Sequence, residues 1–90
     1  MRFEWATEKA AANLAKHGVA FEEARTVFAD PLGRIVDDER HSEDKQRFVL
    51  MGHSEKQRLL ADMFTDRGEA IRLISARVAT CRERREYEEG

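Results

Sequence analysis

Arginines recur along the stretch from Ile71 to Arg85, where their spacing could gather several guanidinium groups around one anion. The stretch opens as an apolar run that carries Arg72 and Arg77. A guanidinium fork matches two oxygens of a phosphate or carboxylate, and an arginine on a stiff strand loses little further entropy on binding. Arg58, at the start of another strand-like run, completes the set of candidate anion-binding arginines.

The elements that must position these arginines follow from the hydrophobic period. Residues 2–5 alternate like a short strand, and two segments with helical spacing follow. The first is a helix capped by Thr7 and ended by Gly18, and the second runs from Val19 to Asp30. From Arg34 onward the period becomes 2, which indicates strands. The predicted strands occupy residues 34–37, 47–52, 58–65 and 69–77. A final helix, capped by Thr80, occupies residues 81–89.

This order predicts an α+β fold, β-α-α-β-β-β-β-α, with a twisted antiparallel sheet packed by helices on one face. Strict alternation places Arg72 with Ile74 and Ala76, opposite to Ile71 and Leu73. The face left free of helices could therefore collect the arginines.

The distribution of charge along the chain supports an anionic partner more strongly than the net charge does. The net charge is -2, yet residues 1–44 carry six basic and ten acidic side chains, whereas residues 45–85 carry ten basic and five acidic ones. Such asymmetry is typical of a protein with an anionic ligand on one face. The alternative is a solvated surface of mixed charge.

Composition limits the remaining classes. Ninety residues make one domain, here residues 1–90, and the 41% apolar content is enough for a core. The single cysteine, Cys81, forms no internal disulfide, which fits the reducing cytoplasm. The longest apolar stretch has four residues, far below the ~20 of a membrane span. Zinc-ligand spacing, glycine-rich phosphate loops and nucleophile elbows are absent from the sequence, so no metal or cofactor is expected.

The order of several motifs resembles the BrnT toxin family. The resemblance covers nearly the whole chain and rests on Phe3-Glu4-Trp5, Lys9, Asn13, Lys16-His17-Gly18-Val19, Phe21-Glu22-Glu23-Ala24, Val27-Phe28-Ala29-Asp30-Pro31, His41-Ser42, Arg47, Gly52, Ser54, Arg58, Arg67-Gly68, Arg72-Leu73-Ile74-Ser75-Ala76-Arg77, Ala79, Glu83-Arg84-Arg85 and Tyr87. The chain departs from the family pattern at Ala6, Ala20, Gln57, Asp62 and Phe64, the last of which lies where many members have histidine.

The resemblance implies a RelE-like fold and a ribonuclease toxin of a type II toxin–antitoxin system that acts in the cytoplasm and inhibits translation. It further implies a BrnA-type antitoxin, whose ribbon-helix-helix part binds operator DNA, so that the complex represses its own operon. The expected substrate is RNA, cleaved without a metal or cofactor, and no membrane is involved.

Metal-independent RNA cleavage needs a base for the 2′-hydroxyl, cations for the phosphorane and an acid for the 5′-oxygen. Arg58, Arg72 and Arg77 are the candidate cations, and His41 and Glu83 are the candidate acid and base.

Three further side chains are candidates for RNA contacts, namely Arg47, Arg84 and Tyr87. Each candidate outside the three cations also has a structural reading: His41 as an exposed loop residue, Glu83 as an ion-pair partner, Tyr87 as a packing residue, Arg47 as a strand-edge side chain and Arg84 as a residue that pairs with Glu88 on its own helix.

Two functions remain open from the sequence. One is the ribonuclease. The other is a catalytically silent module whose basic face binds the antitoxin or a nucleic acid.

Overall fold

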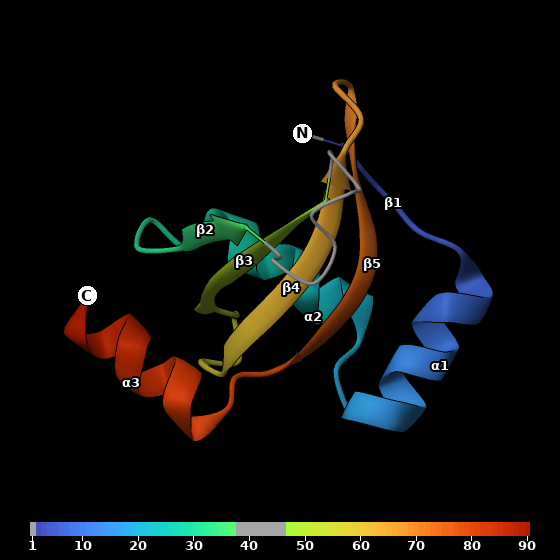
Figure 1. Ribbon diagram of the computed structural model, residues 1–90. Coiled ribbons are helices and arrows are strands. Elements are labelled where there is room, and N and C mark those ends of the chain that lie inside the picture. The colour runs from blue at the N-terminus through green and yellow to red at the C-terminus, as the bar shows by residue number, and fades with distance from the viewer. Residues whose placement is uncertain (1, 38–46) are drawn as a thin grey trace.

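The chain is described by a computed structural model over residues 2–37 and 47–90. The elements are β1 (Arg2–Glu4), α1 (Thr7–His17), α2 (Phe21–Thr26), the 3₁₀ turn η1 (Val27–Ala29), β2 (Arg34–Asp37), β3 (Arg47–His53), β4 (Leu59–Asp66), β5 (Ala70–Val78) and α3 (Cys81–Glu89) (Figure 1). This confirms the predicted α+β class and element order. The second predicted helix is shorter than expected and ends in the 3₁₀ turn before Pro31.

The helix ends follow local chemistry in most places. Gly18 ends α1 in the left-handed conformation, with a φ of 70° that only glycine adopts at little cost. Thr80 caps α3, and Glu83 completes a capping box with it. The prediction for Thr7 is wrong, because Ala6 occupies the N-cap of α1 and Thr7 is already helical. Helices α1 and α2 thus begin without a side-chain cap and depend on packing.

The five strands form one sheet in the order β1-β5-β4-β3-β2 (Figure 1). Strands β2 to β5 form an antiparallel meander, as expected, whereas β1 pairs in parallel with the start of β5. The parallel pair is possible because α1 and α2 intervene between the two strands as a crossover.

One face of the sheet packs on α1 and α2 and forms the main core. Aromatic rings of Phe3, Phe28 and Phe64 meet edge to face at 5.0 and 5.1 Å. Phe3 and Phe28 are partly buried, whereas the fully buried apolar residues of this core include Val19, Phe21, Ala24, Val27, Leu60, Leu73 and Ala76.

Asn13 of α1 closes the β5 edge where β1 no longer pairs with it. Its amide donates to the carbonyls of Val19 and Ala76, each at 2.9 Å, and its carbonyl accepts from the Ala76 N–H at 3.0 Å. The carboxamide therefore replaces a neighbouring strand for one residue of β5 and protects that edge from further pairing.

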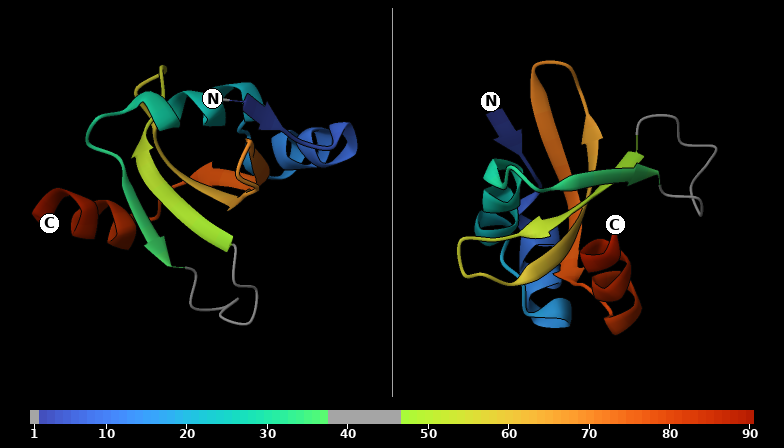
Figure 2. Two further views of the ribbon diagram at one scale, coloured as in Figure 1. Left: turned by 90° about the horizontal axis from the view of Figure 1, so that it is seen from above. Right: turned by 90° about the vertical axis from the view of Figure 1, so that its left-hand side faces the viewer.

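The opposite face of the sheet is partly covered by α3, and Figure 2 shows α2 and α3 on opposite sides of the sheet. Met51, Leu59 and Ala61 form a second small core here, and Tyr87 of α3 packs against it. The expectation of a face free of helices is thus correct for the half near β1 and wrong for the half under α3. Among the described residues, no helix is long and apolar enough to cross a membrane.

The main core contains one acidic side chain without a hydrogen-bond partner. Asp62 of β4 is fully buried, and neither carboxyl oxygen has a partner among the described residues. Burial raises the pKa of Asp62 to about 8, and the charge of nearby Glu23 adds to the shift.

Candidate anion-binding site

A row of polar side chains crosses the open half of the sheet. Arg47 of β3 is paired with Thr65 of β4, Thr65 with Arg72 of β5, and Arg72 with Glu4 of β1. Residues directly opposite on neighbouring strands point to the same face, with Cβ atoms roughly 5 Å apart. The register of four strands therefore places two arginines, a hydroxyl and a carboxylate side by side.

A β-bulge in β5 decides which arginines share this face. Met63 pairs with Ser75 and Phe64 with Leu73, so Ile74 is an extra residue in β5. Leu73 and Ala76 consequently both point into the main core. The predicted face for Ala76 is wrong for this reason, since a bulge shifts the alternation by one residue.

The bulge also turns Arg77 to the same face as Arg72. Without it, residues five apart on a strand would point to opposite faces. Arg77 is paired with Ala61, which belongs to the second core under α3, whereas Arg72 lies in the row on the open half.

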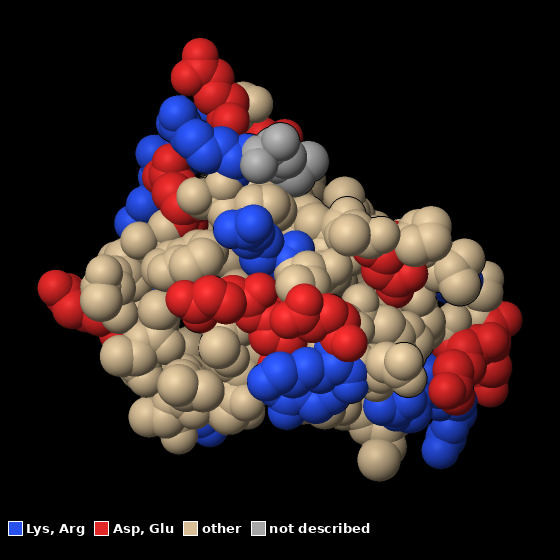
Figure 3. Space-filling view, turned by 180° about the vertical axis from the view of Figure 1, so that it is seen from behind, with Lys and Arg blue, Asp and Glu red and all other residues tan. Residues whose placement is uncertain are grey.

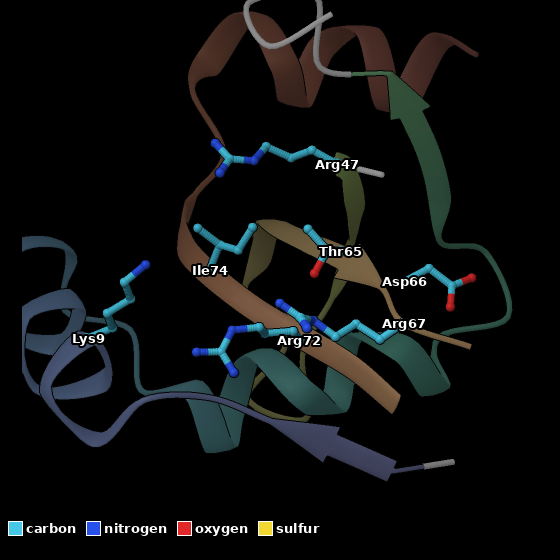
Figure 4. A pocket seen from close by; sticks show the side chains of 7 residues that line it. All are labelled: Lys9, Arg47, Thr65, Asp66, Arg67, Arg72 and Ile74. Carbon is cyan, nitrogen blue, oxygen red and sulfur yellow. The ribbon is translucent and has the colours of Figure 1, made fainter. Parts of the chain in front are cut away.

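Arg47, Thr65 and Arg72 of this row line a pocket of about 570 Å³, beside which Glu4 pairs with Arg72. Figure 4 shows Lys9 reaching in from α1 and Arg47 from the start of β3, with Arg67 and Arg72 next to one another across Ile74 and Thr65 from Arg47. The described residues that line it are Lys9, Arg47, Thr65, Asp66, Arg67, Arg72 and Ile74. Four cationic side chains and one carboxylate make this an electropositive cavity, which favours an anion.

The charges within the pocket differ in how they are engaged. Arg72 forms an ion pair with Glu4 at 3.0 Å, while in the part of the chain that the structure describes Lys9 and Arg67 have no ion pair. The Asp66 carboxylate accepts the Gly68 N–H at 2.9 Å within the hairpin turn. The Thr65 hydroxyl oxygen is buried and has no hydrogen-bond partner among the described residues, so a donor remains inside an electropositive pocket.

Arg77 lies outside this pocket and is held by Glu83. Two of its nitrogens donate to the two carboxylate oxygens at 2.6 and 2.9 Å. One of those oxygens also accepts the Thr80 N–H at 2.9 Å. The hydrogen bonds from Arg77 lower the pKa of Glu83 to about 2, so this carboxylate is ionised at neutral pH and is a weak proton acceptor.

Arg58 has a different environment from the other two arginines. Its guanidinium donates to the buried Glu23 carboxylate at 2.5 and 2.9 Å and to the Gly18 carbonyl at 3.1 Å. Ser54 donates to the same carboxylate at 2.6 Å. Hydrogen bonding by Arg58 lowers the pKa of Glu23. Arg58 thereby joins the start of β4 to α2 and the end of α1, and it does not line the pocket.

The remaining candidates are dispersed. Arg84 pairs with Glu88 on its own helix at 3.8 Å. Tyr87 packs α3 onto the sheet: its hydroxyl donates to the Leu32 carbonyl at 3.0 Å, its ring meets His53 edge to face, and Arg34 lies over it. His41 falls outside the described residues.

Sequence reasoning overlooked Lys9, Thr65 and Arg67 as parts of one site. Lys9 is an ordinary surface lysine in a helical pattern, and Arg67 is a turn residue. Only the register of β3 to β5 and the position of α1 bring them to Arg72. The one signal in the sequence for this site was that Arg67 lies just before the predicted strand that carries Arg72 and Arg77.

The face of the sheet that carries α2 has a second pocket, of about 660 Å³, whose described lining combines Arg25 with the acidic side chains of Asp30 and Glu55. Seen from behind, acidic and basic side chains lie next to one another (Figure 3). Among the described residues, no group of three or more histidine, cysteine or acidic side chains is arranged to hold a metal ion.

Comparison with known proteins finds similarity to a solved structure and to a family model. A crystal structure at 1.1 Å resolution of the Brucella abortus ribonuclease toxin, BrnT, superimposes with a TM-score of 0.70 and 23% sequence identity, covering 89% of this chain and 97% of that one. At this identity the likeness shows the shared fold. No curated protein matches the sequence. The family model described as "Ribonuclease toxin, BrnT, of type II toxin-antitoxin system" matches residues 5–83, and the chain therefore belongs to the BrnT family of ribonuclease toxins.

Proposed function

We propose that this chain is a metal-independent, RelE-like endoribonuclease that inhibits translation in the cytoplasm. The observation that carries the proposal is the electropositive pocket on the open half of the sheet, in a chain that belongs to a ribonuclease toxin family. A cavity lined by four cationic side chains suits the phosphate backbone of RNA, which dominates nucleic-acid affinity.

In the proposed reaction, the 2′-oxygen of RNA attacks the adjacent phosphorus while the bond from phosphorus to the 5′-oxygen breaks. Arg47 and Arg72 hold the phosphate in the pocket and stabilise the charge that develops on its oxygens. Arg77 contributes positive charge on the same face. The proton steps are assigned to His41, whose unperturbed pKa lies near neutrality.

The remaining candidates take supporting roles in this proposal. Glu83 orients Arg77, because its ionised carboxylate accepts both guanidinium nitrogens. Arg58 maintains the fold around Glu23. Arg84 and Tyr87 lie on α3 and extend the RNA-contacting surface beyond the pocket.

The decisive experiment incubates the purified chain with RNA in excess EDTA. Removing one preorganised charge donor typically lowers a rate by on the order of 10²–10³, so Arg72→Ala should lose cleavage by that factor with an unchanged circular dichroism spectrum. Arg82→Ala is the matched control, since Arg82 is 88% exposed on α3. Equal rates for the two variants would contradict the assignment of Arg72.

We propose a BrnA-type antitoxin with a ribbon-helix-helix part as the partner, because membership of a type II system implies an antitoxin. The toxin–antitoxin complex would bind operator DNA through the antitoxin and repress its own operon. A reporter driven by that operator should respond to the complex and not to the toxin alone.

The second candidate function is a catalytically silent module that binds the antitoxin or a nucleic acid. Pairing of Arg58, Arg72 and Arg77 with carboxylates favours it, since paired arginines have less charge to offer a substrate. Absence of cleavage at any concentration of protein, together with tight antitoxin binding, would establish the module and refute the enzyme.

A further inference from the structure

We propose that the pocket is a single-phosphate site in which Glu4 is a built-in competitor, occupying Arg72 until a phosphate displaces it. The inference rests on the proposed function for the origin of the phosphate, which is RNA. Binding of the phosphate itself is a property of the pocket and is measurable without cleavage.

The pocket is organised for a tetrahedral anion by groups from four segments. Lys9 comes from α1, Arg47 from β3, Arg67 from the β4–β5 turn and Arg72 from β5 (Figure 4). The Thr65 hydroxyl, buried between the two arginines of the row, adds a donor for a phosphate oxygen. A phosphate carries enough acceptor lone pairs to engage several of these donors at once.

Glu4 is the anion that the fold already supplies to this row. Its backbone is paired with that of Arg72, and its carboxylate accepts one guanidinium nitrogen at 3.0 Å. Both side chains are about one third exposed, at 36% for Glu4 and 33% for Arg72. An ion pair of this kind contributes little, because water screens it and both side chains lose freedom.

The other arginine–carboxylate pairs are held far more firmly. Glu83 accepts two bonds from Arg77 and one from the Thr80 N–H, and it belongs to a helix cap. Glu23 is 3% exposed and accepts from Arg58 and Ser54. Among these three pairs, only the pair of Arg72 has a single contact, so Arg72 is the arginine that an incoming anion can recruit.

Asp66 does not compete in the same way. Its carboxylate accepts the Gly68 N–H in the hairpin turn, and Gly68 has a φ of 81° that fixes this turn. The carboxylate is therefore engaged by backbone, whereas, among the residues that the structure describes, the Glu4 carboxylate is engaged only by the arginine that the phosphate needs.

Removing the competitor should tighten binding, and removing donors should weaken it. Glu4→Gln keeps the size of the side chain and removes its charge, so we expect affinity for phosphate to rise about two- to fivefold, the range of an exposed ion pair. Thr65→Val and Lys9→Ala should each lower the affinity by a similar factor or more.

The test titrates inorganic phosphate, and separately a single-stranded RNA whose 2′-hydroxyls are methylated, into each folded variant while arginine side-chain NMR signals are recorded. Methylation blocks attack by the 2′-oxygen, so binding is measured apart from chemistry. Glu22→Gln is the control, because Glu22 is exposed on α2 against the other face of the sheet and its loss changes the net charge equally.

The inference is supported if phosphate shifts the Arg72 signal, if Glu4→Gln binds more tightly than Glu22→Gln, and if Thr65→Val binds more weakly than the original chain. It is overturned if the two glutamine variants bind phosphate with equal affinity. It is also overturned if Thr65→Val and Lys9→Ala leave the affinity for phosphate unchanged. If the supporting binding results are found but unmodified RNA is not cleaved, the ribonuclease proposal is refuted and the phosphate site still stands. If unmodified RNA is cleaved but the supporting binding results are not found, only the phosphate site is refuted.

Discussion

The buried carboxyl of Asp62 makes the stability of this fold depend on pH in an unusual direction. The side chain lies on the core face of β4, between Leu60 and Phe64, with no exposed surface. Glu23 is the charged group whose interaction with it is resolved, and Arg58 keeps Glu23 ionised. Asp62 is therefore protonated in the folded chain at neutral pH, since its pKa is raised to about 8.

The magnitude follows from the two pKa values. The pKa of Asp62 rises from 3.8 in the unfolded chain to about 8 in the folded one. Between these values the folded chain holds a proton that the unfolded chain releases, so each pH unit lowers the free energy of unfolding by about 1.4 kcal/mol. The contribution of Asp62 should therefore fall by about 2.7 kcal/mol between pH 5 and pH 7, and it should level off above pH 8.

The assay is urea denaturation of the original chain and of Asp62→Asn at several pH values from 5 to 8. Asparagine is also a buried polar group, but it does not titrate, so its cost is constant with pH. We expect Asp62→Asn to gain stability relative to the original chain by about 2.7 kcal/mol between pH 5 and pH 7.

Glu22→Gln on the exposed face of α2 is again the control and should follow the original chain across this range. Parallel pH profiles for the original chain and Asp62→Asn would refute the argument, because they would mean that Asp62 titrates alike in the folded and unfolded states.

Two further predictions concern the contacts that join the helices to the sheet. Arg58→Ala should lower the free energy of unfolding by about 2 kcal/mol in urea denaturation, since Glu23 would keep only Ser54 as a buried hydrogen-bond donor; an unchanged urea midpoint would contradict this structural role. Asn13→Ala removes three buried hydrogen bonds and should lower the free energy of unfolding by about 3 kcal/mol. The Ala76 amide should then exchange its hydrogen faster than in the original chain. An equal exchange rate would show that Asn13 does not protect this edge of β5.

The element order was accessible from sequence because its signals are local. Alternation with period 2, helical spacing and the left-handed Gly18 each depend on residues within a few positions. The cap at Thr80 was equally readable. The cap at Thr7 was misassigned because a hydroxyl side chain is favoured at an N-cap, whereas α1 begins after Ala6, which makes no side-chain cap hydrogen bond.

The candidate site was predicted in part. Arg47 and Arg72 were singled out by residue type and position, and the fold brings both into one pocket. Arg58 was grouped with them on the same evidence, yet its guanidinium is engaged by Glu23, which lies 35 residues earlier in the chain. Residue type alone does not distinguish an arginine that binds a ligand from one that fixes a helix to a sheet.

By itself, the sequence determined which segments become strands and helices, and it singled out arginines as candidates for binding an anion. Local backbone preference and hydrophobic period depend only on residues that are close in sequence, so they can be recognised without the tertiary structure. The tertiary structure decided which charges meet. The extra residue at Ile74 turned Arg77 to the face of Arg72, and the register of four strands aligned Arg47, Thr65, Arg72 and Glu4. Register depends on how the whole core packs, because a slip of one residue would move every side chain of a strand to the other face.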